Sequence, residues 1–151
     1  MPTVSRTFVK AGMIYFVFSL IVGLLLEIDA VSLPALMPLF WHMLMVGWIT
    51  QIIMGVSIWM FPGRNRDEGF WNQKWIWLTL VLLNSGLVLR LMAEPAVGYS
   101  GAQIWSVLLV FSATLQVAAG GTYVTEMWPR IMSKKQQRKK RKRQRQRNKQ
   151  K

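Results

Sequence analysis

Four long apolar runs dominate this sequence and constrain its fold more than any other feature. A helix crosses the hydrocarbon core of a bilayer with about 20 mostly apolar residues. The runs lack the alternation of barrel strands, and spanning segments must pair their backbone groups internally, so each run predicts a helix. We therefore expect an all-α integral membrane four-helix bundle over residues 1–132. Its helices are expected at about residues 11–26, 37–61, 74–92 and 104–127.

The C-terminal segment, residues 133–151, has a different composition. Residues 134–151 contain twelve of the nineteen Lys and Arg residues of the chain and no acidic residue. The remaining seven basic residues face six acidic ones, so this segment carries nearly all of the formal charge of +13. It has no apolar residue with which to form a core. We expect a disordered cytoplasmic tail that binds anionic lipid headgroups. The alternative ligand is a nucleic acid, namely RNA.

The distribution of basic residues predicts the orientation of the helices. Lys and Arg gather in cytoplasmic loops close to helix ends. Basic residues precede the first run, lie between the second and third, and follow the fourth, whereas the links at about 27–36 and 93–103 contain none. Four helices with both termini cytoplasmic, in the cell inner membrane, fit this pattern. The alternative is that the first run is a cleaved signal peptide. Cleavage sites need small residues, and for a cut after Ala30 the residue three positions before the cut would be Ile28, which is not small.

Small and polar residues recur at every fourth position in three of the runs. Residues four apart share one face of a helix. Small residues let helix backbones approach closely, and buried glutamines find partners across the contact. We interpret these stripes as the packed interior of the bundle, and a pocket for a quinone or pigment is the alternative. The stripes are Ala11, Tyr15, Ser19, Gly23 and Glu27; Gly47, Gln51 and Gly55; and Ser112, Gln116 and Gly120.

His42 and Arg90 are the candidate site residues. On an ideal α-helix His42, the only histidine, lies about 140° from Gly47, where it would face a neighbouring chain, a cofactor or lipid headgroups. Arg90 lies near the end of the third run, with Glu94 four residues later and Pro95 predicted to end the helix. Both side chains are expected in the outer layer of the membrane. Arg90 would snorkel, pair with Glu94, or anchor an anionic group such as a haem propionate.

The residue types present exclude several kinds of chemistry. The chain has no cysteine, so it has no thiolate nucleophile or thiolate metal site. Its six acidic residues fall at predicted helix ends or in links, which gives no support for a carboxylate proton relay. It also shows no phosphate-binding loop and no nucleophile–base motif. We therefore expect no enzymatic activity from this chain alone.

Two stretches carry a resemblance to a known family. The stretch "WHMLMVGWITQIIMGVSIWMFP" (41–62) resembles the second helix of subunit I in the haem-copper oxidase and nitric oxide reductase superfamily. The stretch "LLNSGLVLRLMAEP" (82–95) resembles short four-helix bacterial proteins commonly grouped with that subunit. The resemblance implies that His42 ligates the iron of a b-type haem, for electron transfer or as a respiratory accessory subunit.

The chain also departs from that family in ways that limit what the resemblance implies. The family's catalytic subunit has many more helices and further histidines for a second haem ligand and copper, so oxygen or nitric oxide reduction is not expected. A low-spin haem needs two axial ligands, which a symmetric homodimer or Met45 would complete here. The alternative function is a non-enzymatic membrane scaffold or subunit of a larger complex.

The predicted orientation can be tested by cysteine labelling in intact cells. Asp29→Cys and Val97→Cys should react with a membrane-impermeant thiol reagent, because the links without basic residues are expected outside. Arg66→Cys should react only after the cells are opened. The reverse pattern would contradict the predicted topology.

Overall fold

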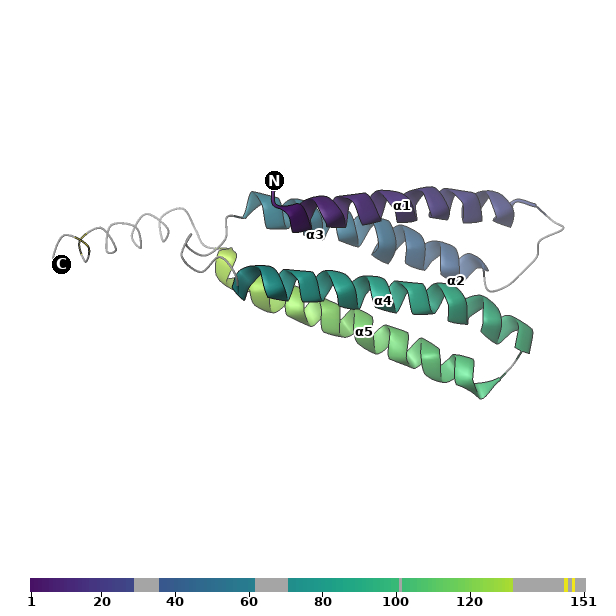
Figure 1. Ribbon diagram of the computed structural model, residues 1–151. Helices are drawn as coiled ribbons and strands as arrows, with labels where there is room; N and C mark the ends of the chain where they lie inside the picture. The colour runs from purple at the N-terminus through teal and green to yellow at the C-terminus, as the bar shows by residue number, and fades with distance from the viewer. Residues whose placement is uncertain (29–35, 62–70, 101, 132–145, 147, 149–151) are drawn as a thin grey trace.

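The computed structural model describes residues 1–28, 36–61, 71–100, 102–131, 146 and 148. Every element within these residues is helical (Figure 1). The elements are α1 (Thr3–Leu26), α2 (Leu36–Trp41), the π-helix η2 (His42–Thr50), α3 (Gln51–Met60), α4 (Trp71–Ser100), α5 (Gln103–Met127) and the short 3-10 helix η4 (Trp128–Arg130). Because α2, η2 and α3 follow one another without a break, they form one long rod.

The expected all-α fold with four long helices is thus confirmed for the described part of the chain. Among the described residues, four ranges are long and apolar enough to cross a membrane: Thr3–Leu26, Leu36–Met60, Lys74–Ser100 and Gln103–Arg130. The expected tail at 133–151 lies outside the described residues, apart from Gln146 and Asn148.

The helices form two antiparallel hairpins. In the first, α1 packs on the rod of α2, η2 and α3, and in the second α4 packs on α5. The hairpins meet mainly through α4, which contacts α1, α2 and η2. The start of α1 and the end of α5 lie at the same end of the bundle, here called the termini end (Figure 1). The opposite end, where α1 and α4 end and α2 and α5 begin, is the loop end.

Helix α4 is longer than the sequence predicts. It continues through Pro95 to Ser100, so the expectation that Pro95 ends the helix is wrong. A proline removes one intrahelical hydrogen bond, the one that would reach the carbonyl of Leu91. The turn around it is held by tertiary packing, since Ala93 is fully buried.

Glycines allow the helices of each hairpin to pack backbone against backbone. A Cβ at Gly47 on η2 would lie 2.8 Å from the Cβ of Tyr15 on α1. A Cβ at Gly86 on α4 would lie 2.9 Å from Cγ of Gln116 and 3.0 Å from the carbonyl oxygen of Ser112, both on α5. Only glycine permits approaches this close.

In each hairpin a serine hydroxyl also donates to a glycine carbonyl of the neighbouring helix. Ser5 on α1 donates to the carbonyl of Gly55 on α3, and Ser112 on α5 donates to the carbonyl of Gly86 on α4 at 2.6 Å. Glycine has no side chain to keep the neighbouring helix at a distance, so a hydroxyl of that helix can reach the glycine carbonyl. Both serines are fully buried and have their hydrogen bond satisfied.

The predicted small-residue stripes are correct in part. The buried members are Tyr15, Ser19, Gly47, Gln51, Gly55 and Ser112. Glu27 is exposed, and a Cβ at Gly120 would meet nothing within 4 Å, so the prediction is wrong at these two positions. A strict four-residue spacing winds around an α-helix by about 40° per step. At the level of Gly120 the interior position belongs to its neighbour Ala119, which is fully buried.

Gly86→Ala and Gly120→Ala should change stability in opposite directions. Alanine favours a helix over glycine by about 1 kcal/mol, and at Gly120 nothing opposes that gain. At Gly86 the new methyl group would push against the backbone of α5, and overpacking costs about 1–3 kcal/mol. Thermal unfolding of the detergent-purified variants measures the difference. A stabilised Gly86→Ala protein would contradict the close contact.

Candidate functional site

His42 is the first residue of the π-helix η2. In a π-helix the backbone hydrogen bonds join residues five apart. The side chain of Thr50 follows the same spacing, because its Oγ1 donates to the carbonyl of Met45 at 2.8 Å. A π-helix has more residues per turn than an α-helix, so residues five apart come closer to one face. His42 contacts Arg90 and Glu94 of α4, whereas Gly47 contacts Tyr15 of α1. His42 therefore meets a helix of its own chain, where the sequence led us to expect a neighbouring chain, a cofactor or lipid headgroups.

His42 forms a polar cluster with Arg90 and Glu94 of α4. Arg90 Nη1 lies 2.8 Å from His42 Nε2. Arginine can only donate, so Nε2 is the acceptor and the ring proton is assigned to Nδ1. That Nδ1 lies 2.8 Å from the carbonyl oxygen of Pro38 and 3.0 Å from Oε1 of Glu94. The ring is thus a neutral imidazole between one positive and one negative side chain, and we call these three residues the His42 clamp.

The His42 clamp is partly shielded from its surroundings. The side chains of His42, Arg90 and Glu94 are 30%, 18% and 9% exposed. Arg90 Nε lies 3.5 Å from Oε1 of Glu94, beyond good hydrogen-bond length, and neither this Nε nor Oε2 of Glu94 has a hydrogen bond within the described residues. Burying charges is costly unless each has a partner. Removing one residue of the clamp therefore leaves a partly buried polar or charged group of the other two without its partner.

Two further polar contacts join the hairpins nearer the termini end. The fully buried Gln51 on α3 donates from Nε2 to Oδ1 of Asn84 on α4 at 3.1 Å. The hydroxyls of Ser57 on α3 and Tyr123 on α5 lie 2.6 Å apart. The stripe analysis found Gln51, but it did not find its partner Asn84 or the Ser57–Tyr123 pair. The sequence signal that could have indicated these contacts is the presence of isolated polar residues within the apolar runs.

The geometry of His42 can be compared with what a haem requires. An axial histidine gives the lone pair of one ring nitrogen to the iron. Here the lone pair of Nε2 accepts from Arg90, and Nδ1 carries the proton. The arrangement does not fit an iron ligand unless Arg90 moves away. The structure brings His42 and Arg90 to one level, as expected. Both side chains, however, contact each other and Glu94.

Over its described residues the chain is thus an all-α protein with four long helices, arranged as two hairpins that the His42 clamp helps to join. Comparison with known protein families, with curated proteins and with solved structures found no match. The resemblance to subunit I of the haem-copper oxidases rests on the two quoted stretches alone. Haem ligation by His42 and propionate binding by Arg90 remain predictions.

A double-mutant cycle tests the energetic coupling within the His42 clamp. Arg90→Ala should destabilise the protein by about 1.5–3 kcal/mol, the usual worth of a hydrogen bond to a charged group. His42→Ala combined with Arg90→Ala should cost at least about 0.5 kcal/mol less than the sum of the single changes, because both remove the same contact. Arg6→Ala, an exposed arginine at the termini end, is the control. Equilibrium unfolding in mixed micelles gives the energies, and additive effects would contradict the coupling.

Proposed function

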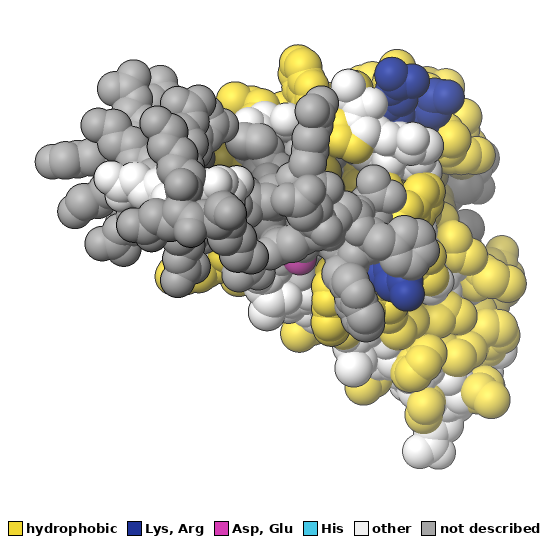
Figure 2. All heavy atoms as spheres, turned by 60° about the vertical axis from the view of Figure 1, so that its left-hand side comes forward, with side chains coloured by type: hydrophobic (Ala, Val, Ile, Leu, Met, Phe, Trp, Pro, Cys, Tyr) yellow, Lys and Arg dark blue, Asp and Glu magenta, His cyan; other side chains and the backbone are white. Residues whose placement is uncertain are grey.

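We propose that this chain is a multi-pass protein of the inner membrane and acts there as a non-enzymatic subunit or scaffold. Its described helices are covered only in part by one another. In α5 just 11% of the most apolar stretch is buried, and hydrophobic side chains cover much of the described surface in Figure 2. Apolar surface on this scale is unfavourable in water. A bilayer, or partner helices within it, would cover it.

The described basic residues support the proposed orientation. Arg6, Lys10, Lys74 and Arg130 belong to the termini end, and Arg90 alone among the described Lys and Arg residues belongs to the loop end. Basic residues concentrate on the cytoplasmic side. Both termini therefore face the cytoplasm in this proposal. The basic tail would follow η4 on the same side, next to anionic headgroups.

The observation that favours a scaffold over a cofactor carrier is the hydrogen bond from Arg90 to Nε2 of His42. The one histidine of the chain is used to hold η2 against α4. A protein whose polar residues join its own helices, and whose outer faces are apolar, is suited to packing beside other membrane helices. Helix α5 is the best placed for such a partner, or for a second copy, since its contacts lie mainly with α4.

A b-type haem bound through His42 is the second candidate function. The π-helix that begins at His42 favours it, because π-helical turns are frequent at functional sites. The ring is also 30% exposed, so one edge is accessible. In this candidate, Arg90 releases Nε2 and turns to a propionate, and the haem supplies electron-transfer chemistry.

Absorption spectra of the purified protein separate the two candidates. The chain is expressed in haem-replete cells, extracted with detergent and compared with His42→Ala. The scaffold proposal expects both proteins in the membrane fraction after an alkaline wash, and no Soret band in either. A Soret band that His42→Ala abolishes would overturn it in favour of haem ligation. Release of the protein by the alkaline wash would contradict membrane insertion itself.

A further inference from the structure

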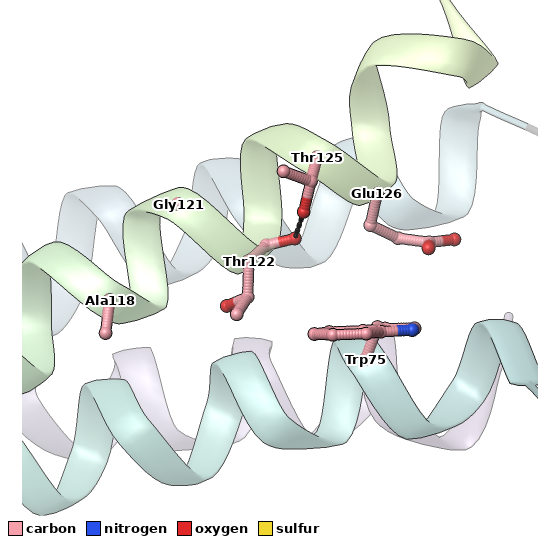
Figure 3. Close-up of a pocket in the computed structure, with 6 residues that line it drawn as sticks. All are labelled: Trp75, Ala118, Gly121, Thr122, Thr125 and Glu126. Carbon is pink, nitrogen blue, oxygen red and sulfur yellow. Dashed lines mark hydrogen bonds between the residues drawn. The ribbon is translucent and has the colours of Figure 1, made fainter.

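A groove lies between α4 and α5 at the termini end. Its volume is ≈ 570 Å³. It exists because small residues on α5 stand opposite a large aromatic side chain on α4 (Figure 3). A Cβ at Gly121 would meet nothing within 4 Å, so the space there is open. The lining residues are Trp75, Ala118, Gly121, Thr122, Thr125 and Glu126.

The groove combines an aromatic face with a carboxylate. Trp75 is 47% exposed, and Figure 3 shows the carboxylate of Glu126 beside the end of the indole that carries its nitrogen. Oε1 of Glu126 accepts from Nε of Arg130 at 3.1 Å and also from its Nη2. Arg130 does not use the other carboxylate oxygen, Oε2, since all its contacts are with Oε1. An indole face attracts cations, and a carboxylate oxygen accepts from an ammonium group.

The position of the groove indicates which ammonium group it would meet. Trp75 lies four residues after the start of α4, and Glu126 lies one residue before the end of α5. In the proposed orientation, on which this inference rests, that level is the headgroup layer of the inner leaflet. About one turn deeper on α4, three residues after Trp75 and so on the same side of the helix, the exposed Leu78 provides an apolar surface for an acyl chain. A phospholipid fits both parts at once.

We propose that this groove binds a phospholipid whose headgroup carries a primary ammonium, with the ammonium between the indole face of Trp75 and Oε2 of Glu126. The phosphate of the same lipid lies among the basic residues of the termini end, which attract it. Glu126 makes the groove selective for this lipid over purely anionic lipids. A headgroup without an ammonium brings only negative charge towards the carboxylate, which disfavours its binding.

Native mass spectrometry of the full chain, released from nanodiscs, tests the proposal. The nanodiscs hold equal amounts of phosphatidylethanolamine and phosphatidylglycerol with identical acyl chains. The expected result is one retained phosphatidylethanolamine, about threefold to tenfold enriched over phosphatidylglycerol. Gly121→Leu fills the groove and should remove the enrichment, as should Trp75→Leu. Gly120→Leu is the matched control, because it also extends into open space but lies outside the groove lining, and it should keep the enrichment.

The possible contrary results are distinct. Equal retention of the two lipids, or enrichment that survives Gly121→Leu, would overturn the proposal. Enrichment that appears only after removal of residues 134–151 would show that a lysine of the tail fills the groove, which would also overturn it. Failure of the chain to enter nanodiscs would instead overturn the proposed membrane function.

Discussion

Arg90 joins the two hairpins at the loop end by donating to His42, and the relative position of the hairpins depends on that contact. Within each hairpin, glycines and serine–carbonyl hydrogen bonds hold the helices at close range without help from the other hairpin. Between the hairpins fewer contacts are made, so each polar contact matters more. A hydrogen bond that involves a charged group is stronger than a neutral one, especially where water is excluded. The neutral Gln51–Asn84 contact supplements the clamp deeper in the bundle.

The contacts of His42 within the fold bear on both of the functions that the residues suggested. A histidine near the end of an apolar helix resembles a haem ligand in sequence, because the ligand role and the structural role require the same residue at the same depth. They differ in what the ring nitrogens contact. Here Arg90 donates to Nε2, and Pro38 and Glu94 surround Nδ1. This geometry favours a structural role, and a haem would have to compete with an internal charged partner.

The two ends of the molecule differ in ways that suit different surroundings. At the loop end Arg90 and Glu94 are largely buried and engaged with each other through His42, and the exposed charged residue Glu27 is acidic. At the termini end Arg6, Lys10 and Lys74 are exposed, and Glu126 lies in a groove beside Trp75. A membrane with an anionic cytoplasmic leaflet presents the same asymmetry. The proposed orientation and the proposed lipid site both follow from this match.

The sequence by itself determined the number and type of the long elements. Apolar runs of about 20 residues without the alternation of barrel strands form helices. The sequence also indicated Gly47, Gln51 and Gly55 as interior positions, since spacing along one helix is a local property. The tertiary structure alone decided that His42 meets Arg90 and Glu94, because those residues belong to another helix. It alone extended α4 past Pro95, where packing outweighs the loss of one hydrogen bond. Gln51 and its partner Asn84 come from different helices, as do the groove residues Trp75 and Glu126, and only packing brings each pair together.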